Sequence, residues 1–253
     1  SADMFAGFDG AFGWTGGESY AGTLFRLPLR TEDQAKTSKL SDRHHTAASL
    51  APLLGDVAAQ AAEMLLFLKA VERVAVYKWA PGAQKPELVH EAAVRDVTPQ
   101  LRHLRAAPLR GPAPATADFA LDVADGSDRQ SWVVRGQMGG ETASVLAARA
   151  AARGDKLLPW AAVAARLDVA EPFEGRAYCF LPLPRKTGLK NVHVNGFFEL
   201  SSNRRDLWAA GAEDERGGAA DARGAWNAAL LADVAAPCLG RALEAAANAP
   251  GAG

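Results

Sequence analysis

Residues 181–208 read LPLPRKTGLKNVHVNGFFELSSNRRDLW, and this stretch decides the fold that we expect. With the residues just before it, its apolar runs predict two strands, Gly175–Leu183 and Val192–Leu200. The basic segment Arg185–Lys190 is interpreted as a solvated hairpin tip that joins them, with contact to an acidic client or a phosphate as the alternative. The second strand leads into the polar run Ser201–Asp206, so charged side chains gather where a buried strand ends.

Two adjacent arginines, Arg204 and Arg205, stand in this polar run. Arginines and hydroxyls at the end of a strand suit the capture of an anion such as a phosphate. The alternative is a structural clamp, in which one arginine pairs with Asp206 and Asn203 bonds the backbone of a tight turn. Side chains of neighbouring strand residues point to opposite faces, so both arginines serve one phosphate only if the chain has already turned.

Outward from this stretch, strands and helices intermix along the chain. Apolar spacing predicts helices at Ser49–Leu68, Pro99–Arg105, Glu141–Arg153 and Asp221–Ala247, the last with a kink at Pro237. It predicts a half-buried strand at Gly22–Arg30 and hairpins at Arg73–Val94 and Thr116–Gly136, while Leu157–Val169 is ambiguous between helix and strand. The expected fold class is therefore α/β (α+β), a mixed, mostly hairpin-joined sheet with flanking helices.

The composition excludes several classes of protein. The chain has 253 residues, 49% hydrophobic and 23% charged, with a net charge of −1, which argues against a nucleic-acid binder. No apolar run approaches the roughly 18 residues that span a bilayer, and no signal peptide is visible. The chain opens with Ser1, which fits a fragment of a longer protein. Cys179 and Cys238 lack metal or redox spacing and predict buried thiols in a reducing, cytoplasmic compartment.

No constellation in the sequence predicts catalysis. There is no nucleophile–base pair, no metal cluster and no phosphate-binding loop. His44 and His45, with Asp42 nearby, are interpreted as loop residues, because adjacent histidines diverge and no third ligand is close in sequence. His193 lies in an apolar strand and is interpreted as a core or partly exposed histidine. We therefore expect no catalytic residue, no metal site and no enzymatic activity in this chain alone.

Two blocks resemble the repeated region of the sacsin-like family: GTLFRLPLRT at residues 22–31 and the long block at residues 181–208. Supporting matches in the same order are FDGAFGW at 8–14, MLLFLKAVERVAV at 64–76 and WNAALLADVAAPCLGRAL at 226–243. Residues 80–170 match only loosely. The resemblance thus spans nearly the whole chain.

The resemblance implies a domain layout. Sacsin-type repeats begin with a nucleotide-binding domain akin to that of the heat-shock chaperones, followed by a segment comparable to their middle region. Residues 1–31 would then be the closing loop and last strand of a nucleotide-binding domain whose main part is absent. Residues 32–253 would be a middle-type α/β domain, with a subdivision near 107–116 and 170 left open.

The resemblance also implies a role and its partners. The motifs that hold ATP and magnesium in such repeats are absent here, so we expect no cofactor in this chain and ATP with magnesium only in the intact repeat. Within that repeat, the cofactor-binding residues contributed by this chain would be Thr23, Arg204 and Arg205. One of the two arginines would reach the terminal phosphate. The expected function is a chaperone-like module in protein folding and quality control that couples the upstream nucleotide-binding domain to clients, co-chaperones or neighbouring repeats, without nucleic acid or membrane. The alternative is a non-catalytic scaffold or docking module.

Overall fold

The chain folds into two compact units. The computed structural model describes residues 5, 7–17, 20–106, 116–208 and 219–249. The first unit comprises Ser1–Ala59 and Ala75–His90, and the second comprises Gln60–Val74 and Glu91–Gly253. The assignment of residues 1–31 to a preceding nucleotide-binding domain stays a prediction, as do the boundary at residue 31 and the subdivisions near 107–116 and 170.

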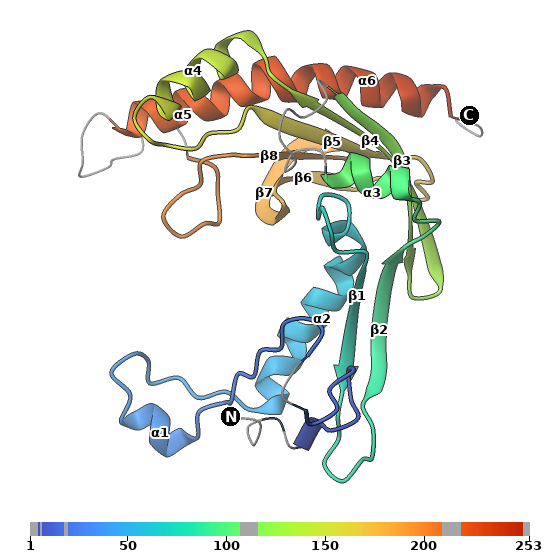
Figure 1. The fold of residues 1–253 in the computed structure, drawn as a ribbon, viewed down its shortest axis with the longest axis vertical. Coiled ribbons are helices and arrows are strands. Elements are labelled where there is room, and N and C mark those ends of the chain that lie inside the picture. Colours follow the sequence, from blue (N-terminus) through green and yellow to red (C-terminus); the bar gives the residue numbers. More distant parts are fainter. Residues whose placement is uncertain (1–4, 6, 18–19, 107–115, 209–218, 250–253) are drawn as a thin grey trace. The chain divides into compact units, whose positions relative to one another are not determined.

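The order of elements alternates short helices with hairpins (Figure 1). The helices are α1 (Glu32–Lys36), α2 (Ala47–Met64), α3 (Pro99–Ala106), α4 (Glu141–Ala151), α5 (Ala219–Ala229), the π-helical η3 (Leu230–Ala235) and α6 (Ala236–Ala247). The strands are β1 (Arg73–Lys78), β2 (Glu87–Val94), β3 (Thr116–Asp125), β4 (Asp128–Met138), β5 (Trp160–Arg166), β6 (Glu174–Cys179), β7 (Leu181–Lys190) and β8 (Val192–Gly196). In the described part of the chain, every helix is too short or too polar to cross a lipid bilayer.

The strands form a mixed sheet in the order β1-β2-β3-β4-β5-β8-β6-β7. From β2 to β8 the neighbouring strands are antiparallel, whereas β6 runs parallel to β8 and antiparallel to β7. The predicted hairpin around Asp125-Gly126 is present as β3 and β4, whose turn places Gly126 at φ +60°. The expected fold class, a mixed sheet with flanking helices, is confirmed. Its likeness to the middle region of heat-shock chaperones stays a prediction.

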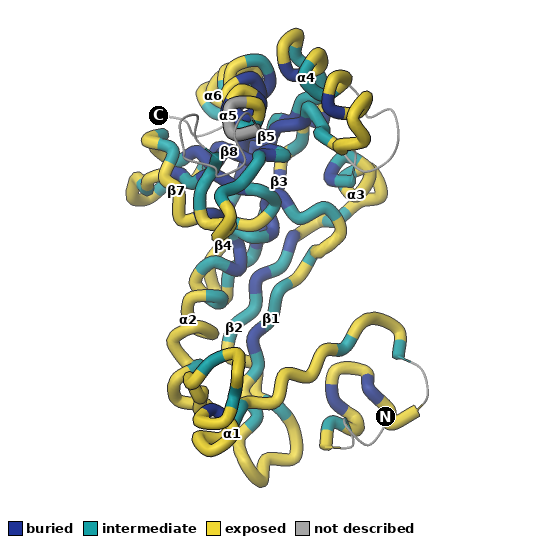
Figure 2. The backbone as a smooth tube through the Cα atoms, turned by 90° about the vertical axis from the view of Figure 1, so that its left-hand side faces the viewer, coloured by how far each residue is buried: buried dark blue, intermediate teal, exposed yellow. Residues whose placement is uncertain are grey.

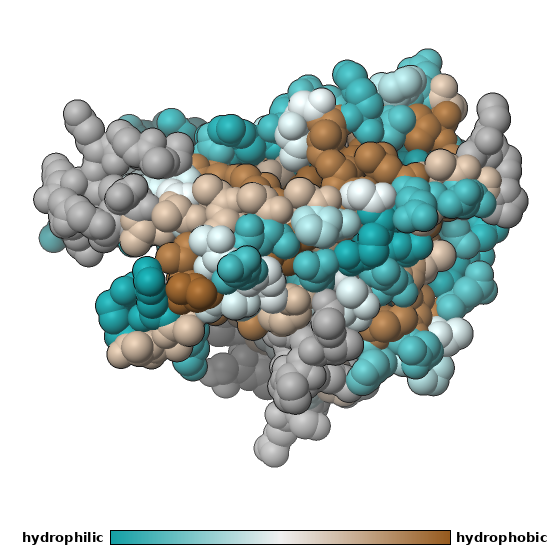
Figure 3. All heavy atoms as spheres, turned by 90° about the horizontal axis from the view of Figure 1, so that it is seen from above, coloured by the Kyte–Doolittle hydropathy of each residue, from teal (hydrophilic) through white to brown (hydrophobic). Residues whose placement is uncertain are grey.

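Alternation along the strands of the second unit gives the sheet two apolar faces. Val133 and Val163 belong to the cluster that packs under α5, η3 and α6, while Trp132, Val134 and Ala164 belong to the opposite cluster with the end of α2. Successive strand residues point to opposite faces, so a strand covered on both sides is apolar at nearly every position. Figure 2 shows β5, at the centre of the sheet, as a buried segment. Figure 3 shows apolar and polar residues mixed on the surface seen from above.

The C-terminal helix is irregular next to Pro237, whereas the kink expected at this residue stays a prediction. Pro237 falls in the first turn of α6, and the six residues before this helix, Leu230–Ala235, form the π-helical segment η3. Asp233 of this segment accepts hydrogen bonds from the backbone N–H groups of Thr142 (2.6 Å) and Ala143 (3.2 Å), at the start of α4. The carboxylate satisfies N–H groups that the helix leaves open and fixes α4 on the same face as α6.

The basic segment Arg185–Lys190 is a strand, and its interpretation as a loop was wrong. It belongs to β7, which pairs with β6 along most of its length with two register shifts. Among the described strands β7 lies at the end of the sheet, where charged side chains remain in water and protect an open edge. The next strand, β8, ends at Gly196, earlier than the predicted end at Leu200. The segment 157–169, which was ambiguous between helix and strand, contains the strand β5.

In the first unit, residues 22–30 are extended but form no ladder with another described strand, so the predicted strand is not present. Phe25 and Leu27 are 82% and 85% exposed, and Leu29 is 44% exposed. The period-2 pattern is in the sequence, but a strand needs a hydrogen-bonding neighbour. The segment therefore presents three large apolar side chains to solvent.

We predict that this segment makes the chain self-associate, because exposed extended backbone with apolar side chains pairs readily with another copy. Sedimentation velocity should show a concentration-dependent shift to larger species that Leu27→Lys reduces. Leu40→Lys, at a site 89% exposed but outside the segment, should leave the shift unchanged. A monomer at high concentration would contradict the prediction.

Candidate functional site

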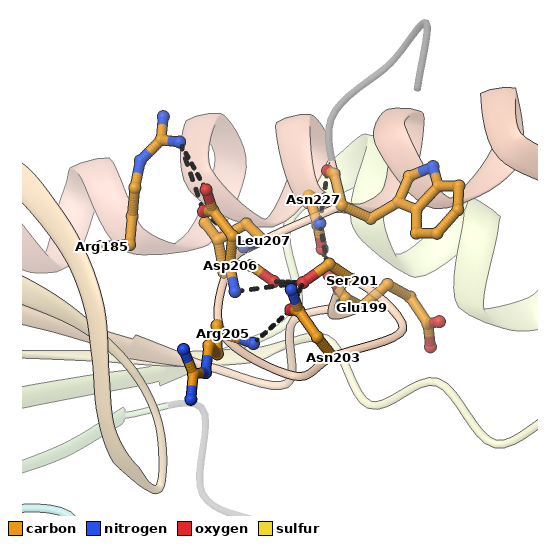
Figure 4. Close-up of polar contacts among 9 residues, drawn as sticks. Arg185, Glu199, Ser201, Asn203, Arg205, Asp206, Leu207 and Asn227 are labelled. Carbon is orange, nitrogen blue, oxygen red and sulfur yellow. Dashed lines mark hydrogen bonds and ion pairs between the residues drawn. The ribbon is translucent and has the colours of Figure 1, made fainter. Parts of the chain in front are cut away.

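The chain reverses direction directly after β8 and builds a small turn from residues 199–208. Leu200 and Leu207 face each other in an antiparallel bridge. Trp208 N–H donates to the carbonyl of Glu199 (2.8 Å), and Ser201 N–H donates to the carbonyl of Asp206 (2.9 Å). The two arms of the turn are thus held by backbone hydrogen bonds (Figure 4).

Side chains fill the inside of this turn. Asn203 Oδ1 accepts from the backbone N–H of Arg205 (3.0 Å) and from the Ser201 hydroxyl (2.8 Å). Ser201 Oγ in turn accepts from the backbone N–H of Asp206 (3.1 Å). Arg204 adopts φ +54°, which reverses the chain at its tip. The prediction that Asn203 bonds the backbone of a tight turn is confirmed.

Asn227 of α5 ties the turn to the helical layer. Its side chain, in a residue only 4% exposed, accepts from the N–H of Glu199 (2.9 Å) and donates to the carbonyls of Glu199 (2.8 Å) and Trp208 (3.0 Å). A buried amide with these three bonds holds both arms in one place. Asn227 was not predicted from the sequence, although a polar residue beside Trp226 in an apolar helix stripe was a signal for such a role.

The carboxylate in the turn pairs with an arginine other than the two expected. Asp206 lies 3.3 Å from Nη1 of Arg185 on β7, so the predicted pairing with Arg204 or Arg205 was wrong. The side chains of Arg204 and Arg205 are exposed and make no ion pair or hydrogen bond with another described residue. Because they stand on a turn, strand alternation does not separate them. Within the described part of the chain, the turn presents two guanidinium groups without a neutralising carboxylate.

A further cation, Lys69, lies among aromatic side chains in the second unit. Its Nζ is 4.0 Å from the ring centroid of Phe180 and 4.7 Å from that of Phe197. Burial lowers the pKa of Lys69 to about 8, against a smaller opposing influence of Cys179. Burial raises the pKa of the Cys179 thiol, while Arg204 and Lys69 act against that rise. The sequence alone did not connect Lys69 and Arg204 with Cys179, because these residues are far apart in the chain and influence one another only in the folded protein.

The remaining candidates separate into structural and exposed residues. His193 is a core histidine: it is 1% exposed, stacks on Trp132, and its Nδ1 accepts from the backbone N–H of Arg176 (3.1 Å). Burial, with smaller effects of nearby cations, lowers its pKa to about 3. Thr23 is exposed in the extended segment of the first unit, and its role stays a prediction. The described residues contain no group of three His, Cys, Asp or Glu placed to hold a metal.

Comparison with known proteins agrees with the motif blocks. The family model described as the sacsin domain matches residues 1–91. Human sacsin is 29% identical over 238 residues, which is 85% of this chain and 5% of the length of that protein. These matches support a sacsin-like family, as the sequence motifs predict. No solved structure gave a significant match.

Proposed function

We propose that this chain is a chaperone-like coupling module of a sacsin-like protein. It would transmit the nucleotide state of an adjacent ATP-binding domain to clients or neighbouring repeats, in the cytoplasm. The observation that carries the proposal is the pair Arg204 and Arg205, exposed on a turn that Asn203 and Asn227 hold in place.

The turn is suited to a phosphate for two physical reasons. Arg185 already neutralises Asp206, so the charge of Arg204 and Arg205 remains available to a ligand. The backbone of the turn is fixed by hydrogen bonds, so little conformational entropy of the main chain is lost when an anion binds. A guanidinium placed at a terminal phosphate stabilises the charge that grows during phosphoryl transfer.

The rest of the nucleotide site would come from the upstream domain. ATP and magnesium would bind there, with Thr23 near the nucleotide, and this chain would supply no catalytic group of its own. Binding of ATP would favour one arrangement of the intact repeat, and that preference would change its contacts with a client or co-chaperone.

The test uses the repeat with its upstream nucleotide-binding domain. Arg204→Ala or Arg205→Ala is expected to lower the steady-state rate of ATP hydrolysis by about a hundredfold or more. Arg95→Ala, an exposed arginine outside the turn, is the matched control and should keep the wild-type rate. Unchanged hydrolysis in both turn variants would refute the role of the arginines. A wild-type repeat that neither binds nor hydrolyses ATP would instead favour the non-catalytic scaffold.

A further inference from the structure

The second unit contains a pocket of about 680 Å³ on its helical side. Its walls come from the end of α4 and the residues after it, from α5, and from the segment after β8. Leu146 and Leu157, both partly buried, contribute apolar surface and pack against the core cluster under the helices, to which Trp226, only 1% exposed, belongs. Trp226 donates from its indole N–H to the carbonyl of Phe197 (2.8 Å), which fixes the ring. The pocket therefore has a small apolar patch, made by Leu146 and Leu157, that rests on the packed core.

Positive charge predominates at this pocket. Arg149, Arg153, Lys156 and Arg223 line it, against the carboxylates of Asp155 and Glu199. Each carboxylate lies near one arginine: Asp155 is 3.8 Å from Arg153, and Glu199 is 3.6 Å from Arg223.

Arg149 and Lys156 have no carboxylate within ion-pair distance among the residues that the structure describes. Counting the described lining residues alone, a net positive charge therefore remains beside the apolar patch.

We propose that this pocket binds an acidic peptide segment that carries a large apolar side chain. The volume lies within the roughly 300–1,000 Å³ of protein binding pockets and admits an apolar side chain with its neighbours. That side chain would bury against Leu146 and Leu157. Asp or Glu residues on either side of it in the peptide would form ion pairs with Arg149 and Lys156. Recognition here needs no nucleotide and is independent of Arg204 and Arg205.

Fluorescence anisotropy with a labelled synthetic peptide, EELLEE, tests the proposal on the whole chain. Wild-type protein should bind it, with an affinity that falls as salt is added. Two comparison peptides separate the contributions: QQLLQQ lacks the charge and EEGGEE lacks the apolar side chains. Both should bind at least about tenfold more weakly, since each loses one half of the recognition.

The matched variants are Arg149→Ala/Lys156→Ala in the pocket and Lys39→Ala/Lys85→Ala in the first unit, which remove the same charge. The pocket variant should weaken binding of EELLEE about tenfold, and the control variant should keep the wild-type affinity. Thermal melts of both variants check that the fold is intact.

The proposal is overturned if wild-type protein does not bind EELLEE, or if QQLLQQ or EEGGEE binds equally well. It is also overturned if the affinity for EELLEE falls equally in the two double variants, because general attraction between charges would then explain the binding. Loss confined to the pocket variant supports it.

Discussion

Arg105→Ala is expected to lower the free energy of unfolding by about 3 kcal/mol, because it leaves one buried and two partly buried carbonyl groups without their donor. Arg105 belongs to α3 and is 5% exposed. Its Nη2 lies 2.9, 2.7 and 2.9 Å from the carbonyl oxygens of Leu65, Leu68 and Val71, in the segment that follows α2. The guanidinium therefore holds this segment through its backbone.

Urea denaturation followed by circular dichroism measures the effect. Arg102→Ala is the matched control, since Arg102 lies one turn earlier on α3 and pairs with Glu72 at the surface. It should change stability little, because exposed ion pairs contribute weakly. Arg105→Met keeps an apolar stem but no donor, and it should lose most of the same stability. If Arg105→Met were as stable as the wild type, packing rather than hydrogen bonding would explain the role of Arg105.

Alternation and helical spacing predicted the elements that are buried on at least one side. The hairpin β3–β4 and the helices α4 and α6 agree with the sequence pattern because their apolar periodicity reflects the faces they bury. Helix α2 also forms as predicted, but Leu53 and Leu54 of its apolar stripe are 58% and 46% exposed. Strand β5 was ambiguous, since Ala161–Ala165 is apolar at every position and such a run suits a buried helix as well as a strand. The length of the run alone does not separate the two.

The errors occur where stability comes from a neighbour and not from the segment itself. The basic residues of β7 resemble a loop, yet pairing with β6 at the edge of the sheet makes them a strand. Residues 22–30 show the opposite case, because their alternation is that of a strand but no described neighbour pairs with them. Propensity and pattern do not report whether a hydrogen-bonding partner exists.

The candidate site was predictable only in part for the same reason. Arg204 and Arg205 were found from one contiguous motif, and so was the local bond of Asn203. The partner of Asp206 is 21 residues away on β7, and Asn227 comes from α5, so both required the fold. The cationic pocket likewise combines α4, α5 and the segment after β8.

Gly175→Ala is expected to lower the free energy of unfolding by about 3 kcal/mol or more, since the added methyl group has no space. A Cβ at Gly175 would lie 1.7 Å from the carbonyl oxygen and 2.7 Å from the carbonyl carbon of Val192, both backbone atoms of β8. A side chain can turn away from such a clash, but here two paired strands must separate. β6 and β8 form the parallel pair of the sheet, so the change weakens the sheet next to the turn with Arg204 and Arg205.

Gly240→Ala is the control, and it is expected to raise the free energy of unfolding instead of lowering it. Gly240 is exposed within α6 and nothing lies within 4 Å of an added Cβ, so alanine should raise stability by about 1 kcal/mol through its helix propensity. Urea denaturation measures both variants, and hydrogen exchange locates the change. Faster exchange of the β6 and β8 amides in Gly175→Ala is the expected pattern. A variant as stable as the wild type, with those amides protected, would show that β6 and β8 do not approach each other this closely in solution.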